Sequence, residues 1–462
     1  MPPFLLPPAP ITSVDQYLAT AWGGRGVRRA QSLGPTGTVD EVARSGLRGR
    51  GGAGFPTGRK WAGVAGSGQA GRRFVVANGA EGEPGSFKDR ALLRANPYQL
   101  VEGLVIAAYA VAAGEAFVCL KRSFEAEIAA VTRAVQELQA AGICTDCPVT
   151  VVAGPEEYLF GEEKAMLEVI EGRAPMPRLL PPHEHGLFAT APQAGWEATA
   201  PRPGGALYGE SNPTLVNNVE TLSAVAHIVA RGSDWFRATG GTADSPGTLV
   251  CTVSGDVIAP DVGEVELGTP LGAVIDAVGS GVGPDRSVKA VFSGVANAVV
   301  TADHLDVALT YEAFSAIGSG MGAGGFIVYD DTACMVEVAR QFSRFLHVES
   351  CGQCPPCKQG SAEITDRLAL VESGRGQEHH LAELGGWLAR VTDANRCYLG
   401  TEEQVVVSSI LRAFPEEFAE HLDGRGCPRS RPLPFPKIVD LDGGRAAYDP
   451  DQHRKQPDWT YA

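Results

Sequence analysis

The chain has 462 residues, 44% of them hydrophobic, and a formal net charge of −15. This length suggests roughly two to four domains, and the acidic balance argues against nucleic-acid binding, which needs basic patches. The longest apolar candidate, residues 104–113, falls well short of the roughly 20 residues that span a bilayer. We therefore expect no nucleic-acid partner and no direct membrane insertion.

The ends of the chain and its cysteines bear on the compartment. Residues 1–9 are rich in proline and lack the basic residues of a secretory signal. Ten cysteines are too few for a disulfide scaffold in a chain of this length, and they suit a reducing environment. We expect a cytoplasmic protein whose membrane contact, where it has one, is made through partner subunits.

The first third of the chain predicts an α/β region. Residues 1–45 are expected to form an irregular arm that ends in a short helix with Thr38 as its N-cap. The hydrophobic pattern then predicts strands at 74–77, 116–120 and 149–152, and helices at 98–113 and 124–141. Alternating strands and helices favour a mostly parallel sheet covered by helices.

The rest of the chain divides by its periodicity. Residues 174–213 have little periodicity and predict a functional or covering loop, and a helix is expected at 217–231. Short β-branched runs at 249–254, 288–292 and 326–329 surround a helix at 271–277, and four helices are expected at 333–346, 358–372, 380–391 and 402–413. The expected regions are an arm (1–45), an α/β domain (46–245), a small α+β domain (246–330), a helical domain (331–425) and a tail (426–462).

Four cysteines predict a metal centre. Cys351, Cys354 and Cys357 form a C-x-x-C-x-x-C run, and Cys397 follows after a helical stretch. Four thiolates are the ligand set of a [4Fe–4S] cluster, which would make the protein a carrier of single electrons. The alternatives are a zinc-stabilised scaffold, although zinc sites usually use two separate C-x-x-C pairs, and free thiols.

A glycine-rich loop at residues 46–58 predicts a ligand site. Gly49, Gly51 and Gly54 match G-x-G-x-x-G, but a helix-like segment precedes them where the dinucleotide fingerprint needs a strand. Glycines let the backbone N–H groups form an anion-binding concavity, and Arg50 and Lys60 add positive charge. We expect a phosphate-bearing ligand here, with a plain tight turn as the alternative.

Two groups of polar residues follow expected strands, at the edge where ligands of open α/β sheets bind, and a third begins an expected helix. They are Asn78, Glu81 and Glu83, then Gly161, Glu162 and Glu163, and at the helix start Asn217 and Asn218. Each group alone could be a surface turn, a helix-dipole partner or a helix cap. Their shared position at transitions from strand to helix predicts one site.

Together these segments resemble the flavoprotein subunit of respiratory NADH dehydrogenase (complex I) and its relatives in NAD-linked hydrogenases and formate dehydrogenases. The resemblance covers roughly residues 40–415 and rests on segments 48–58, 81–85, 161–163, 216–221 and 349–357. It implies an α/β, Rossmann-like FMN domain, a small ubiquitin-like (β-grasp) α+β domain and a C-terminal helical bundle that carries an iron–sulfur cluster.

The resemblance also implies residue roles. FMN would be held by Gly49, Arg50, Gly51, Gly54, Lys60, Asn78, Glu81, Gly161, Glu162, Glu163, Val216, Asn217 and Asn218. Phe55, Glu83 and Tyr158 match positions near the nicotinamide nucleotide, NAD(H), and Glu81 and Glu163 are the candidate catalytic carboxylates, expected to tune the site and bind sugar hydroxyls. The cluster would be held by Cys351, Cys354, Cys357 and Cys397.

The chain departs from the family pattern near the expected nucleotide site. Ala80 stands where the family usually has an aspartate, Leu180 where it has a lysine and His183 where it has a phenylalanine. Residues 188–212 carry an insertion. Loss of an aromatic surface and a cation predicts nucleotide binding weaker by roughly one to a few kcal/mol.

The predicted function is therefore an oxidoreductase subunit that passes electrons between NAD(P)H, FMN and a [4Fe–4S] cluster to a partner. The partner would be a small [2Fe–2S] or ferredoxin-type protein, or other subunits of a membrane complex. The alternative is an NAD-independent relay that exchanges electrons with a ferredoxin or a membrane cytochrome.

Overall fold

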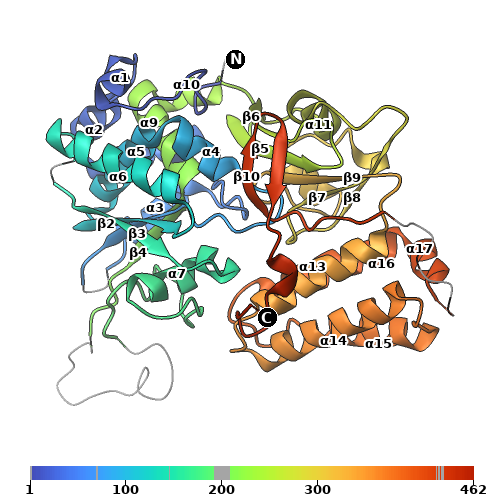
Figure 1. Ribbon diagram of the computed structural model, residues 1–462. Helices are drawn as coiled ribbons and strands as arrows, with labels where there is room; N and C mark the ends of the chain where they lie inside the picture. The colour runs from blue at the N-terminus through green and yellow to red at the C-terminus, as the bar shows by residue number, and fades with distance from the viewer. Residues whose placement is uncertain are drawn as a thin grey trace.

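The computed structural model describes residues 3–68, 71–144, 146–191, 209–422, 424, 427 and 431–461. Figure 1 shows a helix-covered sheet on one side of the molecule, with a second sheet and a group of helices on the other. The last part of the chain runs between them. This arrangement confirms the expected fold class of a parallel α/β region followed by a small α+β region and a helical C-terminal region.

The N-terminal arm is more helical than expected. Its helices are α1 (Val14–Ala19) and α2 (Arg25–Ser45), and α3 (Thr57–Ala65) follows the glycine loop. Gly34 interrupts α2 with a φ of 72°, and Pro35 restarts the helix, because proline suits a first helical position. Thr38 therefore lies inside the helix, and its hydroxyl donates to the Gly34 carbonyl at 2.8 Å, so the expected N-cap was wrong.

The first sheet is fully parallel. Its strands are β1 (Phe74–Asn78), β2 (Glu115–Lys121), β3 (Val149–Gly154) and β4 (Thr214–Asn218), in the order β3-β2-β1-β4. The prediction missed β4 because this short strand ends in two asparagines, which resemble the cap of α9 (Val219–Arg231). The remaining helices of this region are α4 (Lys88–Ala95), α5 (Pro97–Val111), α6 (Glu125–Ala140), α7 (Glu163–Ile170) and α10 (Ser233–Arg237).

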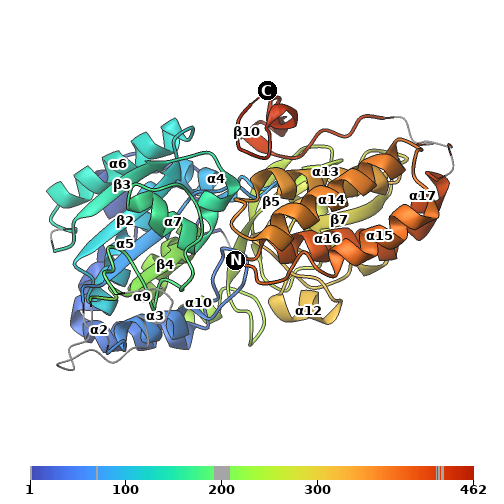
Figure 2. The same cartoon turned by 90° about the horizontal axis from the view of Figure 1, so that it is seen from below.

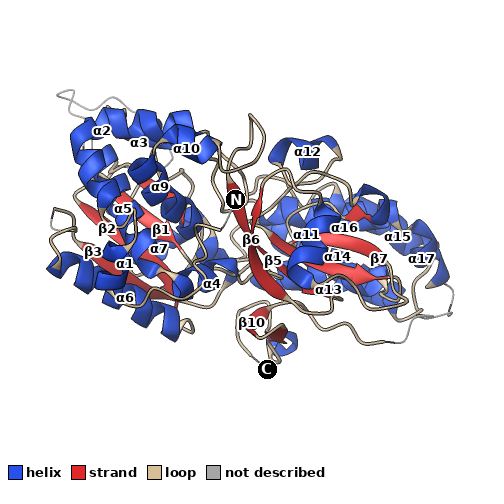
Figure 3. Cartoon of the chain, turned by 90° about the horizontal axis from the view of Figure 1, so that it is seen from above, coloured by secondary structure: helices blue, strands red, loops and turns tan. Residues whose placement is uncertain are grey.

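Both faces of this sheet are buried, because alternate residues of a strand point to opposite faces. Val75 and Ala77 pack in one apolar cluster with residues of α5, α6 and α9. Phe74 and Val76 pack in another, with residues of α7 and of the short 3₁₀ helix Tyr158–Gly161 that precedes it. Figure 3 shows helices enclosing the sheet. Burial on both faces explains why the strands read as continuous apolar runs.

The second sheet has the β-grasp topology. Its strands are β5 (Thr248–Gly255), β6 (Asp261–Glu266), β7 (Val288–Ser293), β8 (Val300–Thr301) and β9 (Gly325–Asp330), in the order β6-β5-β9-β7-β8. β5 and β9 are parallel, and the other pairs are antiparallel. Helix α11 (Leu271–Gly279) covers one face through Leu271, Val274 and Ile275, and the short helix α12 (Tyr311–Ala316) follows β8.

The third region is helical. It consists of α13 (Met335–Glu349), α14 (Pro355–Glu372), α15 (Glu378–Leu388), α16 (Leu399–Ala413) and α17 (Pro415–Glu420). Figure 2 shows α13, α14 and α16 lying side by side, and they share one apolar core. In the described part of the chain, no helix combines the length and the apolar character that crossing a bilayer requires.

The tail ties the regions together. It forms a hairpin of β10 (Ile438–Asp442) and β11 (Arg445–Tyr448), which lies beside β5 and β6 in Figure 1. Arg90 of α4 donates to the carbonyls of Ile438 and Val439 at 2.9 and 3.1 Å. Further on, Lys455 pairs with Glu349 at the end of α13 at 2.7 Å, and both side chains are 1% exposed.

The buried Lys455–Glu349 pair predicts a large effect of removing one partner. Lys455→Met should lower the free energy of unfolding by about 3–5 kcal/mol, because the Glu349 carboxylate is left buried without its cation. Urea unfolding followed by circular dichroism measures the loss.

Two further variants decide whether the loss comes from the unpaired charge. Lys455→Met combined with Glu349→Gln should recover most of the stability, since no charge is then stranded. Arg454→Ala removes the exposed pair with Asp451 and should change stability by less than about 1 kcal/mol. An equal loss in the single and double variants would show that packing, not charge, dominates.

Candidate functional site

A cavity of about 800 Å³ lies where the three regions meet. Its described walls come from the glycine loop, the residues after β1 and β3, the end of β4, the β-grasp region and the start of α16. Of the residues expected at the flavin and nucleotide sites, those that line it are Gly49, Gly51, Gly54, Phe55, Lys60, Asn78, Glu81, Glu83, Tyr158, Gly161, Glu162, Glu163, Val216, Asn217 and Asn218.

The glycine loop is closed on itself, has no room for a side chain at Gly54 and has little room for one at Gly51. The Gly49 N–H donates to the Phe55 carbonyl at 2.8 Å, which brings the two ends of the loop together. Gly54 has a φ of +61°, and a Cβ there would lie 2.3 Å from the ring of Tyr311 in α12. A Cβ on Gly51 would lie 3.2 Å from that of Asn218. The loop therefore lies directly against Asn218 at the end of β4. Its glycines also allow the backbone to approach a ligand closely.

Arg50 is the predicted flavin residue that does not line the cavity. Its guanidinium is 2% exposed and turns toward the β-grasp region, where it donates to the Thr248 carbonyl at 2.9 Å. Its backbone N–H donates to Thr221 Oγ1 of α9 at 2.9 Å. In this structure the Arg50 side chain joins two regions instead of facing the cavity.

Three asparagines are fixed at the carboxyl ends of parallel strands. The register places Asn78 of β1 beside Asn218 of β4. Asn78 donates to the Gly161 carbonyl at 2.8 Å, and Asn217 accepts from the indole N–H of Trp61 at 2.8 Å. Asn218 caps α9 by accepting from the Glu220 N–H at 2.9 Å. These bonds leave little rotamer freedom at the edge of the sheet where ligands of such folds bind.

Glu81 is a buried anion that organises the turn into α4. It accepts from the Ser86 hydroxyl at 2.6 Å and from Arg90 Nε at 3.2 Å. Burial alone would raise the pKa of Glu81, but the charges of Arg90 and Lys88 outweigh it and hold this pKa below its ordinary value. Glu81 is therefore ionised at neutral pH and orders the loop by charge.

Tyr158 links two carboxyl groups at the wall of the cavity. Its hydroxyl lies 2.5 Å from Glu83 Oε2 and 3.3 Å from Glu402 Oε2. A phenol has one proton to donate, so one of the two carboxyls must supply a proton of its own. Burial, and then the charge of Glu83, raise the pKa of Glu402 to about 8. Glu402 is thus the protonated partner at neutral pH.

Two further glutamates flank the start of α7. Glu162 caps this helix by accepting from the backbone N–H of Ala165 at 2.9 Å, and burial raises the pKa of Glu162 to about 7. Glu163 pairs with Lys60 of α3 at 2.7 Å, and both side chains are about one-third exposed. This ion pair connects the glycine-loop helix with α7 at the cavity wall.

The four cysteines expected as metal ligands converge on one small cavity beside the first, lined by Cys351, Cys354, Cys357 and Cys397. The backbone N–H of Arg396 donates to Cys354 Sγ at 3.3 Å, and the Ser350 hydroxyl lies 3.4 Å from Cys357 Sγ. Four thiols with donors directed at sulfur fit a [4Fe–4S] cluster, whose potential such hydrogen bonds tune. Leu159, Cys397 and Leu399 line both cavities and so form a shared wall.

Some lining residues were not predicted from the sequence. Tyr398 and Glu402 come from the start of α16, and Asn297 comes from the β-grasp region. The position of Tyr398 next to Cys397 was the one available signal, because the rest depends on how the regions dock. Ala80 lines the cavity, whereas Leu180 and His183 are absent from its described lining. Most of the expected 188–212 insertion lies outside the described residues.

A ligand cavity that shares a wall with a four-thiol cavity is the arrangement of an oxidoreductase that carries two redox groups. Residues 42–227 match the model of the Nuo51 FMN-binding domain, and residues 337–421 match that of the NADH-ubiquinone oxidoreductase-F iron–sulfur binding region. The chain belongs to the family of the NADH-quinone oxidoreductase F subunits, which are FMN- and [4Fe–4S]-containing electron-transfer flavoproteins, as its sequence led us to expect.

Individual relatives agree along most of the chain. The NADH-quinone oxidoreductase F subunit of Streptomyces coelicolor is 37% identical, over 88% of this chain and 87% of the relative. NADP-reducing hydrogenase subunit HndC of Solidesulfovibrio fructosivorans is 34% identical, over 90% and 82%. The crystal structure of an NAD⁺-reducing [NiFe]-hydrogenase in the H2-reduced state has a TM-score of 0.76 at 30% identity and covers 90% of this chain and 67% of that one.

The geometry of the glycine loop predicts that a substitution at Gly54 causes a specific loss of flavin. Gly54→Ala should abolish tight FMN retention, because the new Cβ would overlap the Tyr311 ring and the residue would keep an unfavourable positive φ. Flavin content of the purified protein, from its visible spectrum, measures the effect. Gly63→Ala is the matched control, since its Cβ meets no atom within 4 Å, and it should keep full flavin. Normal flavin in Gly54→Ala would show that the loop adapts.

Proposed function

We propose that this subunit oxidises a nicotinamide dinucleotide, preferentially NADH, in the large cavity and delivers the electrons to a partner protein by way of the cysteine cavity. The observation that carries the proposal is the wall of Leu159, Cys397 and Leu399 common to both cavities. Because the two proposed redox sites share these wall residues, electrons need not cross the body of the protein.

The chain's own residues fit both redox groups. When bound, FMN supplies the exchange between hydride transfer and one-electron transfer, and a [4Fe–4S] cluster supplies a one-electron carrier. The glycine loop and Lys60 would hold the flavin phosphate, and Asn78, Asn217 and Asn218 would fix the flavin at the strand ends. Cys351, Cys354, Cys357 and Cys397 would hold the cluster.

The charges of the cavity favour NADH over NADPH. Its lining carries the carboxyl groups of Glu81, Glu83, Asp89, Glu162 and Glu163, besides that of Glu402, which is protonated at neutral pH, whereas the positive charge of the described lining comes from Lys60. Carboxylates bind ribose hydroxyls and repel a 2′-phosphate. Phe55 and Tyr398 are 48% and 60% exposed and line the same cavity, so they offer aromatic surfaces for a nicotinamide or adenine ring.

The partner is a second redox subunit. The relatives are named as subunits of a quinone oxidoreductase and of a hydrogenase, which indicates work inside a larger complex. We propose a small [2Fe–2S] or ferredoxin-type protein as the direct acceptor. Any attachment to a membrane would then be peripheral and run through partner subunits.

Reduction of the bound flavin tests the choice of donor. Under anaerobic conditions, NADH should bleach the flavin absorbance of the protein at lower concentration than NADPH. Bleaching by reduced ferredoxin with no response to either nucleotide would support an NAD-independent relay instead. Absence of flavin and iron after reconstitution would contradict both electron-transfer functions. The zinc-stabilised scaffold would then be the remaining alternative.

Removal of one thiol separates the two redox sites. Cys354→Ala should lose the cluster while FMN remains, because Cys354 lines the cysteine cavity and is absent from the flavin cavity. Iron analysis and the flavin spectrum measure the two groups, and NADH should still bleach the flavin. Cys147→Ala, a buried thiol beside β3, is the control that keeps its iron. Full iron retention in Cys354→Ala would refute the ligand assignment.

The raised carboxyl pKa values predict the pH dependence of nucleotide binding. The pKa of Glu162 is raised to about 7 and that of Glu402 to about 8, mainly by burial, so both ionise as pH rises from 6 to 9. The added negative charge should weaken binding of the anionic dinucleotide across this range. The NADH concentration for half-maximal bleaching measures it, and Glu402→Gln should flatten the upper part of the profile. A profile that is unchanged in Glu402→Gln would exclude this carboxyl as the cause.

A further inference from the structure

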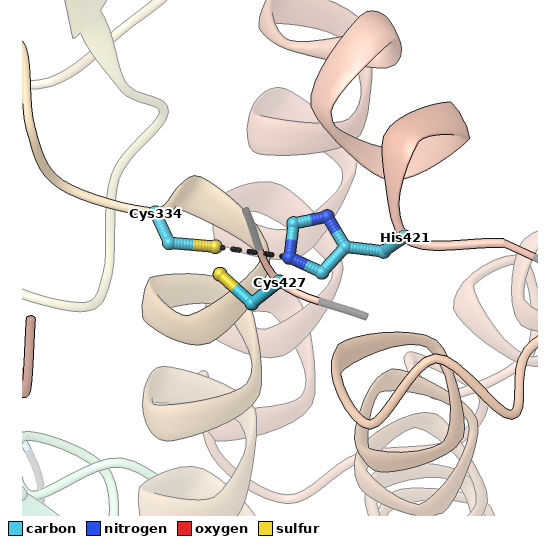
Figure 4. Close-up of side chains that lie close together, drawn as sticks. All are labelled: Cys334, His421 and Cys427. Carbon is cyan, nitrogen blue, oxygen red and sulfur yellow. Dashed lines mark hydrogen bonds between the residues drawn. The ribbon is translucent and has the colours of Figure 1, made fainter. Parts of the chain in front are cut away.

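A second group of potential metal ligands lies apart from both cavities. Cys334, His421 and Cys427 come together from distant parts of the chain, and their ligating atoms all lie within 4.8 Å of one another. Figure 4 shows the two sulfur atoms beside one edge of the imidazole ring. None of the three lines the flavin cavity or the cysteine cavity, so the proposed electron transfer does not account for them.

The imidazole of His421 is oriented as a ligand. The side chain is 0% exposed, and its Nδ1 lies 2.6 Å from the Glu417 carbonyl, one turn back along α17. A carbonyl can only accept, so Nδ1 carries the proton and Nε2 keeps its lone pair. That Nε2 lies 3.4 Å from Cys334 Sγ. Metal-bound histidines typically donate their second N–H to a carbonyl in this way.

Cys334 is placed at the positive end of a helix. It is 2% exposed and is the N-cap of α13 (Met335–Glu349). The positive end of a helix dipole favours a metal-bound thiolate at this position. Cys427 supplies the second sulfur from the start of the tail.

The spacing suits one ion. Tetrahedral zinc, with bonds of about 2.3 Å to sulfur and 2.0 Å to nitrogen, separates a sulfur and a nitrogen ligand by roughly 3.5 Å and two sulfurs by roughly 3.8 Å. The distance of 3.4 Å between Cys334 Sγ and His421 Nε2 is already close to the value for a sulfur and a nitrogen ligand. The Cys427 ligand atom lies within 4.8 Å of the other two, so a small movement toward them would bring it to bonding distance of the same ion. The four cluster cysteines do not form such a compact group among the described residues, as expected for thiols around a larger cluster.

We propose that Cys334, His421 and Cys427 bind one Zn²⁺ ion, with the fourth position filled by water or another donor. Binding releases the two thiol protons to solvent, and the imidazole contributes its lone pair without losing a proton, so no oxidant or reductant is needed. The ion would join the start of α13 to the end of α17 and to the beginning of the tail. It would be a structural metal site of the helical region, separate from the redox groups.

Metal analysis of the purified holoprotein tests the proposal. We expect one zinc per chain in addition to the iron of the cluster. His421→Gln and Cys427→Ser should each lose the zinc and keep iron and flavin, since neither residue lines a redox cavity. His379→Ala and Cys147→Ala are the controls with the same residue types elsewhere, and both should keep zinc. Zinc that is absent from the wild type, or equal in all variants, would overturn the proposal.

Cobalt gives a readout that does not depend on folding of a variant. Zinc-depleted wild-type protein with its cluster intact should take up one Co²⁺ ion and gain the charge-transfer absorption of thiolate–cobalt bonds, and added Zn²⁺ should reverse it. The Cys427→Ser protein, which should not retain the metal, should show no such band. A disulfide between Cys334 and Cys427 in protein kept anaerobic, found by peptide mapping, would also overturn the proposal, since its sulfurs could not bind the ion.

Discussion

The site depends on a buried set of charges at the junction between the α/β region and the β-grasp region. Glu220 is 0% exposed and accepts from Lys88 at 2.9 Å and from the Val250 N–H at 2.9 Å, while Arg50 lies close enough for an ion pair. Buried charges of this kind contribute little net stability but tolerate few alternative arrangements. We infer that this junction fixes the angle at which β5 meets α9. The glycine loop lies between Tyr311 and Asn218, so its position depends on the same angle.

The way in which the regions meet at this junction decides which residues line the large cavity. The carboxyl ends of β1 and β4 form the floor of the cavity, the β-grasp region forms one wall, and the start of α16 forms another. Because Cys397 lies two residues before that helix, the docking that completes the large cavity also brings Cys397, a proposed cluster ligand, to the same wall. The two proposed redox sites therefore share a wall. A change in how the helical region docks would alter the geometry of both.

The sequence was sufficient for features that are local. The parallel strands, the glycine loop and the C-x-x-C-x-x-C run each carry their own pattern, and the family they indicated was correct. It was less informative where a position depends on docking. Arg50 was expected near a phosphate because it lies among glycines, and in this structure its guanidinium donates to the Thr248 carbonyl. Glu402 gave no signal, since its raised pKa arises from burial and then from the charge of Glu83, and both depend on the docked fold.

The same argument explains why the Cys334, His421 and Cys427 group has no sequence signature. Eighty-seven residues separate Cys334 from His421, and no short ligand spacing marks the pair. The fold joins them because α13 begins where α17 ends, next to the Lys289–Glu417 ion pair that connects the β-grasp and helical regions. A metal clasp here would hold the chain at the point where it leaves the bundle, before the tail crosses to Arg90 and returns to Glu349. The tail would then be anchored at three places, one in each part of its course.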